Sequence, residues 1–181
     1  MRSMSARPRP LALLAASVVL GAAACAAPAA TIPPTAAQTG PAPPLTGEEL
    51  VVFFLDEGRY AVGTEPYEVA VVRPAGGATD RPRAVLDALF EGPTPEERAR
   101  GLALVASGFT GVGSLRIADG VAHVSLVGTC RGGGATYSVA NLVRANLLPF
   151  AEIAWVKVYD EHGETETPAS QADSIPFCLE P

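Results

Sequence analysis

A proline-rich segment near the N-terminus limits how much of this chain can fold into a core. Residues 26–45 contain six prolines, no charged residue and no aromatic residue. Such a composition favours extended, polyproline-like conformations and cannot supply the apolar side chains of a hydrophobic core. The folded part is therefore expected to run from residue 46 to the C-terminus, which is enough for one domain.

The segment before these prolines has the features of an export signal. Residues 1–10 carry three arginines and no acid, and residues 11–24 are almost entirely apolar. This apolar run is shorter than the about 20 residues of a membrane-spanning helix, so it indicates a cleaved signal peptide. The small residues before Cys25 resemble a bacterial lipobox, which implies that residues 1–24 are removed and that Cys25 is lipidated. Residues 25–45 would then be a spacer. An ordinary secreted protein with a chance cysteine at the cut is the alternative.

Removal of the signal would make the chain more acidic. The full chain has 13 basic and 19 acidic residues, for a net charge of −6, and residues 1–24 hold three arginines and no acid. The mature chain keeps 10 basic and 19 acidic residues, a net charge of −9. Nucleic acids are unsuitable partners because phosphate binding needs clustered cations. An anionic membrane surface would repel the domain, so we expect an extracytoplasmic protein held at the cell membrane by its lipid.

Two cysteines remain in the folded part, Cys130 and Cys178. Outside the cytoplasm such a pair favours a disulfide over two free thiols. The bond would tie the C-terminal tail to the middle of the domain. Their separation does not fit a metal site or a CxxC redox motif.

Periodicity in the folded part predicts a mixed α/β domain. Apolar or alternating runs indicate strands, and apolar residues spaced at helical intervals indicate two helices. Asp119-Gly120 between two alternating runs predicts a tight hairpin. The expected strands are 50–56, 67–74, the two arms of the hairpin within 113–128, and 151–160; the expected helices lie within 81–92 and 135–150.

The stretch "LFEGPTPEERARGL", residues 89–102, contains paired acids and arginines that resemble a catalytic loop. Thr94 followed by Glu97 is a capping box, with Pro95 where a missing N–H costs nothing. Glu96 and Glu97 lie at the positive end of the short helix, and adjacent residues of a helix point in different directions. The stretch therefore predicts a helix–turn–helix corner rather than acid–base chemistry.

Other candidates for chemistry are sparse. His123 and His162 are too far apart for a local metal-binding motif, and no GxSxG elbow is present. His123 is interpreted as a packed or surface strand residue. "RGGGAT" lacks the lysine of a phosphate-binding loop. An acidic turn at residues 160–166 lacks the spacing of a calcium-binding loop. We therefore predict no catalytic residue, no metal site and no cofactor. The acids of that turn are Asp160, Glu161, Glu164 and Glu166.

The pieces "VVFFLD", "PRAVLDALFEGPTPEERARGL", "LRIADGVAHVSL" and "YSVANLVRANLLPFAEIAWVKVYDEHG" resemble the GerMN domain, a sporulation and germination domain. The resemblance covers roughly residues 51–163, and "GTCRGGG" and "ALVASGFTGVG" depart from it. It implies a non-catalytic extracytoplasmic α+β module in residues 46–163, with two helices packed on one face of a mixed or antiparallel sheet of about five strands. Residues 164–181 would form a tail tied by the disulfide.

Two classes of function follow. The first is a membrane-anchored scaffold or interaction module whose exposed sheet face or edge binds another cell-envelope protein or a glycan, with sporulation or germination among the roles the resemblance implies. The second is a small-ligand or substrate-binding lipoprotein that serves a transporter or a sensor. A domain of this size has little room for two lobes around a cleft.

Overall fold

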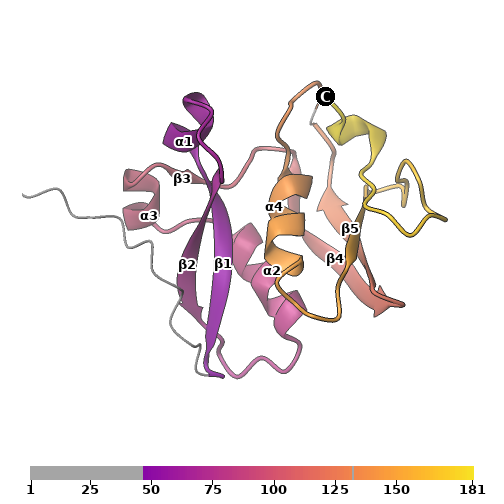
Figure 1. Cartoon of the computed structure of the whole chain (residues 1–181), viewed down its shortest axis with the longest axis horizontal. Coiled ribbons are helices and arrows are strands. Elements are labelled where there is room, and N and C mark those ends of the chain that lie inside the picture. The colour runs from indigo at the N-terminus through magenta and orange to yellow at the C-terminus, as the bar shows by residue number, and fades with distance from the viewer. Residues whose placement is uncertain (1–46, 132) are drawn as a thin grey trace, which may run out of the picture. The chain divides into compact units, whose positions relative to one another are not determined.

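The computed structural model describes residues 47–131 and 133–181 (Figure 1). Cys25, the predicted signal peptide and the whole predicted spacer lie outside these residues. The described strands are β1 (Glu49–Asp56), β2 (Glu68–Pro74), β3 (Leu102–Ala103), β4 (Phe109–Ala118), β5 (Val121–Gly128) and β6 (Trp155–Tyr159). The described helices are α1 (Glu57–Ala61), α2 (Arg81–Glu91), α3 (Pro95–Ala99), α4 (Val139–Leu147) and the 3₁₀ helix η1 (Phe177–Leu179).

The strands form two small sheets, and the α+β class expected from the sequence is confirmed. One sheet is antiparallel with the order β2-β1-β3, and we call it sheet A. The other has the order β4-β5-β6, with β5 and β6 parallel, and we call it sheet B. The expected single sheet of about five strands is thus divided in two. The division arises because β3 pairs with only two residues of β1, and the rest of that edge faces α4 instead of another strand.

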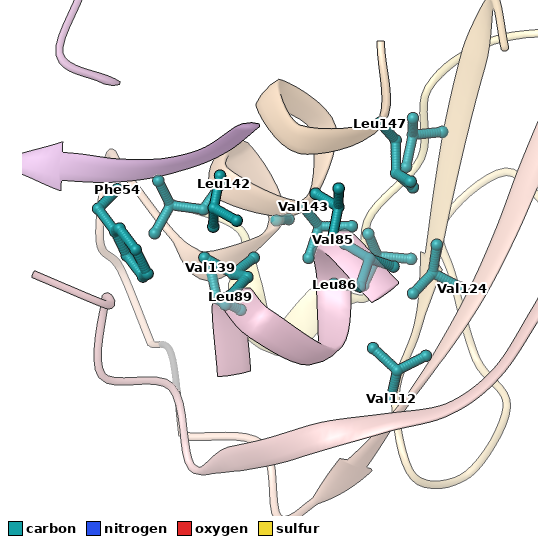
Figure 2. Close-up of a cluster of buried hydrophobic side chains, with 14 of the residues drawn as sticks. Phe54, Val85, Leu86, Leu89, Val112, Val124, Val139, Leu142, Val143 and Leu147 are labelled. Carbon is teal, nitrogen blue, oxygen red and sulfur yellow. The ribbon is translucent and has the colours of Figure 1, made fainter. Parts of the chain in front are cut away.

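Helices α2 and α4 lie between the two sheets (Figure 1). Helix α2 contacts β1 and β4, whereas α4 contacts β1 and β6. The helical spacing of Val139, Leu142, Val143 and Leu147 predicted one buried face, and all four side chains are fully buried (Figure 2). Each such side chain contributes about 1.5–3 kcal/mol by leaving water, so the helices join both sheets into one core.

The corner at residues 92–101 is built as its sequence predicts. Thr94 caps α3, and the Glu97 carboxylate accepts the Thr94 backbone N–H at 2.8 Å, which completes the capping box. Glu97 has a second role that the sequence did not show. Its buried carboxylate pairs with the Arg73 guanidinium of β2 at 2.6 Å, which fixes α3 against sheet A.

The predicted hairpin is also present, with positive φ at Asp119 (51°) and Gly120 (78°) as a tight turn requires. Two local expectations were wrong. Strand β4 begins at Phe109, earlier than expected, and β-bulges interrupt its pairing near Gly111 and Gly113. The sequence EGRY at residues 57–60 indicates a turn, but these residues begin the short helix α1, because the Asp56 carboxylate accepts the Arg59 backbone N–H and caps it.

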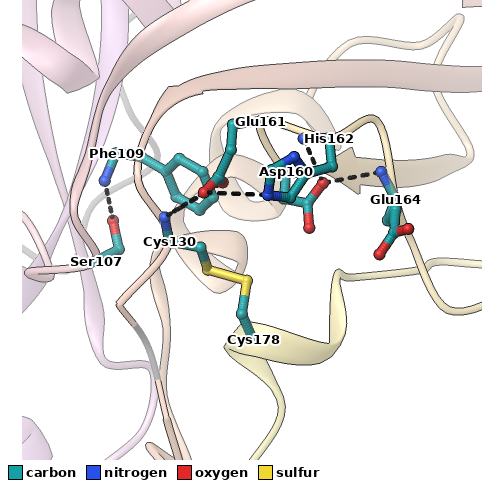
Figure 3. The surroundings of a disulfide bond; sticks show 8 residues. All are labelled: Ser107, Phe109, Cys130, Asp160, Glu161, His162, Glu164 and Cys178. Atoms are coloured by element: carbon teal, nitrogen blue, oxygen red, sulfur yellow. Dashed lines mark hydrogen bonds and ion pairs between the residues drawn. A yellow bond between two sulfur atoms is a disulfide. The ribbon is translucent and has the colours of Figure 1, made fainter.

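The C-terminal tail lies along sheet B, although its sequence has little regular pattern. Ser174 lies beside β6 and forms a parallel bridge with Lys157 of that strand. The Ser174 backbone N–H donates to the Val156 carbonyl at 3.1 Å. The predicted disulfide between Cys130 and Cys178 is present and ties the end of the tail to the loop after β5 (Figure 3). None of the helices in the described part of the chain has the length and apolarity needed to cross a bilayer.

Candidate functional site

The most distinctive surface feature is the edge of β1 that faces α4. Successive residues of a strand direct their backbone N–H and C=O groups to opposite edges. On this edge the Glu57 N–H donates to Gly101, the Phe53 backbone bonds to Asn146, and the Glu49 carbonyl accepts from Arg81. Val51 lies between Glu49 and Phe53 in this alternation. Its N–H and C=O therefore point to the same edge, where nothing in residues 47–131 and 133–181 bonds to them.

Asn146 ends the open part of this edge. Its Oδ1 accepts the Phe53 N–H at 2.9 Å and its Nδ2 donates to the Phe53 carbonyl at 2.9 Å. Nδ2 also donates to the Leu142 carbonyl within α4 at 2.8 Å, so the carboxamide, which is 1% exposed, is fully bonded. A side-chain amide has the same donor and acceptor as a peptide group. Asn146 thus pairs with β1 as a neighbouring strand would, but for one residue only.

An apolar groove of about 360 Å³ runs beside this edge. At its other end Arg81, the first residue of α2, donates from its guanidinium to the carbonyls of Gly47 and Glu49. These acceptors carry no net charge, so the guanidinium brings a positive charge to one end of the groove. The groove is lined by Val51, Phe53, Arg81, Val85, Asn146, Pro149 and Phe150.

The solvent side of sheet A continues the apolar surface of the groove. Val51 is the cross-strand partner of Val72, and Phe53 is the partner of Ala70, so these four side chains share one face. The opposite face of β1 carries the core residues, which are buried. Val72 is 53% exposed. We call Val51, Phe53, Ala70, Val72, Pro149 and Phe150 the sheet A surface.

Sheet B carries a second candidate, a polar hollow of about 410 Å³. His123 lies in the middle of β5 and stacks against Tyr159 of β6, and a hydrogen bond of 2.9 Å joins its Nδ1 to the Tyr159 hydroxyl. Arg116 is the cross-strand partner of His123 on β4. The hollow is lined by Ser114, Arg116, His123, Ser125, Tyr159 and Gly163.

His123 is partly buried and flanked by cations. Burial lowers the pKa of its imidazole, and the charges of Arg116 and Lys157 lower it further. The ring therefore favours its neutral form, which can accept or donate a hydrogen bond but carries no positive charge. His162 lies in the acidic turn and is not brought to His123. The two histidines do not form a shared site.

The acidic turn and the glycine-rich loop are occupied by local bonds. Asp160 Oδ1 accepts the backbone N–H groups of His162 and Glu164, and Glu161 accepts from the Cys130 N–H (Figure 3). No cluster of three histidine, cysteine or acidic side chains is placed to hold a metal within the described residues.

In the loop, the N–H groups of Gly133 and Gly134 donate to carbonyls of Cys178 and Glu180. A phosphate group would have to displace these bonds. The loop therefore attaches the tail, and the positive φ of Gly134 (80°) accounts for a glycine there.

Sequence reasoning missed the residues that make the sheet A surface distinctive. Phe53 and Asn146 are 93 positions apart, and nothing in either local pattern links them. Arg81 is the first residue of the predicted helix within 81–92, and nothing in that pattern indicates its place beside β1. The one available signal was Asn146 itself, a polar residue on the same helical face as Leu142 and Val143.

These features define a class of protein, a small, disulfide-linked α+β domain with an open strand edge. Residues 47–131 and 133–181 bring no cluster of catalytic groups together. Neither family models nor curated proteins match the chain. Among solved structures, it is similar to the tandem GerMN domains of the sporulation protein GerM from Bacillus subtilis, with a TM-score of 0.42 and 20% sequence identity. The match covers 64% of this chain and 42% of that one. The sequence motifs resemble the same domain family.

Proposed function

We propose that this protein is a membrane-anchored, extracytoplasmic interaction module that performs no catalysis and binds another envelope protein through the sheet A surface. The observation that carries the proposal is the continuity of apolar side chains from the exposed strand face of Val72 into the groove beside Phe150. Contiguous apolar surface on a small domain is characteristic of contact sites with other proteins. The positive charge of Arg81 at the rim favours an acidic contact on the partner.

Site-specific photo-crosslinking in the native envelope tests this function. A photoreactive residue at Val72 or Phe150 of the full-length chain should give a discrete adduct, whereas the same residue at Arg116 on sheet B should not. The Phe53→Asp variant should abolish the Val72 adduct without unfolding the chain. Equal adducts at all three positions, or an adduct that Phe53→Asp leaves unchanged, would contradict the proposal.

The anchor is a separate part of the proposal and rests on the sequence before residue 46. Replacement of Cys25 by alanine should move the protein from the membrane fraction to the soluble extracytoplasmic fraction. Mass spectrometry of the wild-type N-terminus should find a diacylglyceryl group on Cys25. A mature N-terminal Cys25 without that group would remove the anchor and leave the interaction surface untouched.

A second candidate function is small-ligand binding in the polar hollow of sheet B. It is favoured by the convergence of Arg116, His123 and Tyr159 on one face. Titration of the full-length chain with N-acetylglucosamine and with inorganic phosphate, followed by NMR, tests it directly. Shifts confined to the hollow and lost in Arg116→Gln would support ligand binding there, and unchanged spectra would exclude these two ligand chemistries.

A further inference from the structure

The open edge of β1 is short and bounded. Toward the C-terminal end of the strand, the Asn146 side chain bonds the Phe53 N–H and C=O. Toward the N-terminal end, the Arg81 guanidinium donates to the Glu49 carbonyl. Between them the Val51 N–H and C=O face the groove with no partner among the described residues. Exposed strand edges are sites where another chain can pair, and such pairing is one of the recurring modes of peptide recognition.

We propose that this edge receives an extended peptide of a partner protein, which pairs its backbone with Val51, places an apolar side chain in the groove and directs a carboxylate to Arg81. This inference rests on the proposed function and specifies the chemistry of the partner. It requires no change in the fold, because the edge, the groove and the guanidinium are already in place.

Each part of the proposed ligand follows from a separate feature. A peptide backbone fits because Val51 presents one donor and one acceptor at strand spacing, which a lipid or a sugar does not match. An apolar side chain fits the surface formed by Val85, Pro149 and Phe150. A carboxylate complements Arg81, because both acceptors that Arg81 already bonds are uncharged carbonyls.

The boundaries also set the character of the complex. A peptide that pairs only at Val51 gains two backbone hydrogen bonds, since Asn146 already fills the next position on this edge. The register is fixed by the two ends of the gap. We expect weak, fast-exchanging binding by an isolated peptide, with selectivity for an apolar residue near an acidic one.

NMR titration of the ¹⁵N-labelled, oxidised full-length chain provides the test. The probes are acetylated peptides of the form Thr-Val-Thr-X-Asp with an amidated end, in which X is valine, isoleucine, leucine or phenylalanine. At least one should shift the amide signals of Val51, Val85 and Phe150, and Asp→Asn in that peptide should weaken binding roughly fivefold or more. Arg81→Gln in the protein should have the same effect and should abolish the difference between the two peptides.

Blocking the backbone separates strand pairing from simple apolar contact. Val51→Pro removes the N–H and should abolish binding. The matched control is Glu68→Pro, because Glu68 is the first residue of β2, directs its N–H to the opposite, outer edge of the same sheet and lies outside the sheet A surface. If Val51→Pro does not fold, peptides N-methylated at each residue in turn make the same test on the unchanged protein, and methylation of the pairing residue should abolish binding.

The outcomes distinguish the two levels of the proposal. Binding that survives both Val51→Pro and every N-methylation would overturn strand pairing, while loss of partner crosslinking in Phe53→Asp would still support the proposed function. Unchanged Val51, Val85 and Phe150 signals with all four peptides at millimolar concentration would overturn the inference. Self-association of the chain that protects the Val51 amide would assign the edge to a second copy and would equally overturn it.

Discussion

The outer edge of β6 in sheet B and the edge of β1 that faces α4 in sheet A differ in how fully they are covered. The outer edge of β6 is covered by the tail, where the Val158 N–H donates to the Ser174 carbonyl at 2.9 Å and the Ser174 N–H donates to Val156. Lys157 lies beneath the tail and is 1% exposed. The edge of β1 is covered by single side-chain contacts from Asn146 and Arg81, which leave Val51 open.

This difference shows that the fold covers the edge of β6 with a backbone segment but covers this edge of β1 only in part. Uncovered edges favour unwanted pairing, and proteins usually protect them. Here eighteen residues of tail and a disulfide protect one edge, whereas the other keeps a gap of one residue beside an apolar groove. The following predictions test how much the contacts on each sheet contribute to the free energy of unfolding.

The largest effect is expected from loss of the disulfide. The bond joins cysteines 48 positions apart, and a loop of that length stabilises the folded state by about 4 kcal/mol. Cys130→Ser with Cys178→Ser should lower the free energy of unfolding by about this amount in urea titrations. Reduction of the wild-type chain should have the same effect, and reduction of the double variant should have none. A wild-type midpoint that is insensitive to reductant would contradict the assignment.

The next largest effect is expected at Asn146. Asn146→Ala leaves the Phe53 N–H and C=O without their partner, removes a side-chain donor from the Leu142 carbonyl, and should cost about 2–3 kcal/mol. Hydrogen exchange should show faster exchange of the Phe53 amide. Asn141→Ala is the matched control, because it removes a side-chain amide from the start of the same helix and should leave the Phe53 amide protected. Equal exchange in both variants would show that the side-chain amide does not act as a strand substitute.

A smaller effect is expected where α4 holds the tail. Arg144 pairs with Asp173 at 2.5 Å, and both side chains are partly exposed. Pairs in such positions contribute little, so Arg144→Gln should cost about 0.5 kcal/mol. Asp173→Ala should cost more, because the other carboxylate oxygen accepts the Val156 N–H at 2.8 Å. Thermal melts of the two variants measure the difference. Equal losses would mean that the backbone contact contributes nothing.

The smallest effect concerns pH and His123. Its pKa is lowered in the folded state, so below the ordinary value of 6.5 the unfolded chain binds protons more readily. This contribution is present above that value and is lost as pH falls through the lower folded pKa. Stability should therefore fall as the pH falls below 6.5. His123→Gln should make the urea midpoint less sensitive between pH 7.5 and 5.5, and His162→Gln is the control.

Local patterns predicted local structure well. The capping box of Thr94 and Glu97, the turn at Asp119-Gly120 and the buried face of α4 depend on residues within one or two turns of each other, so sequence spacing was enough. The disulfide was also predictable, because the two cysteines of the folded part, Cys130 and Cys178, allow only one pairing with each other.

Features that join distant segments were not predictable. The bond from Asn146 to Phe53, the ion pair of Glu97 with Arg73 and the addition of Ser174 to β6 depend on how elements pack, which periodicity does not encode. The division into two sheets has the same origin. The candidate site on β1 therefore had to be found in the structure, whereas the predicted lipidation of Cys25 rests on sequence alone.

The burial of Lys157 has a practical consequence, because it is the only lysine of the chain. Amine-directed crosslinkers and labels have no accessible side-chain target while the tail is seated over it. Cleavage by a lysine-specific endoproteinase would likewise require the tail to lift. A single cut after Lys157 would thus report how often sheet B becomes uncovered, in the native chain and without any introduced probe.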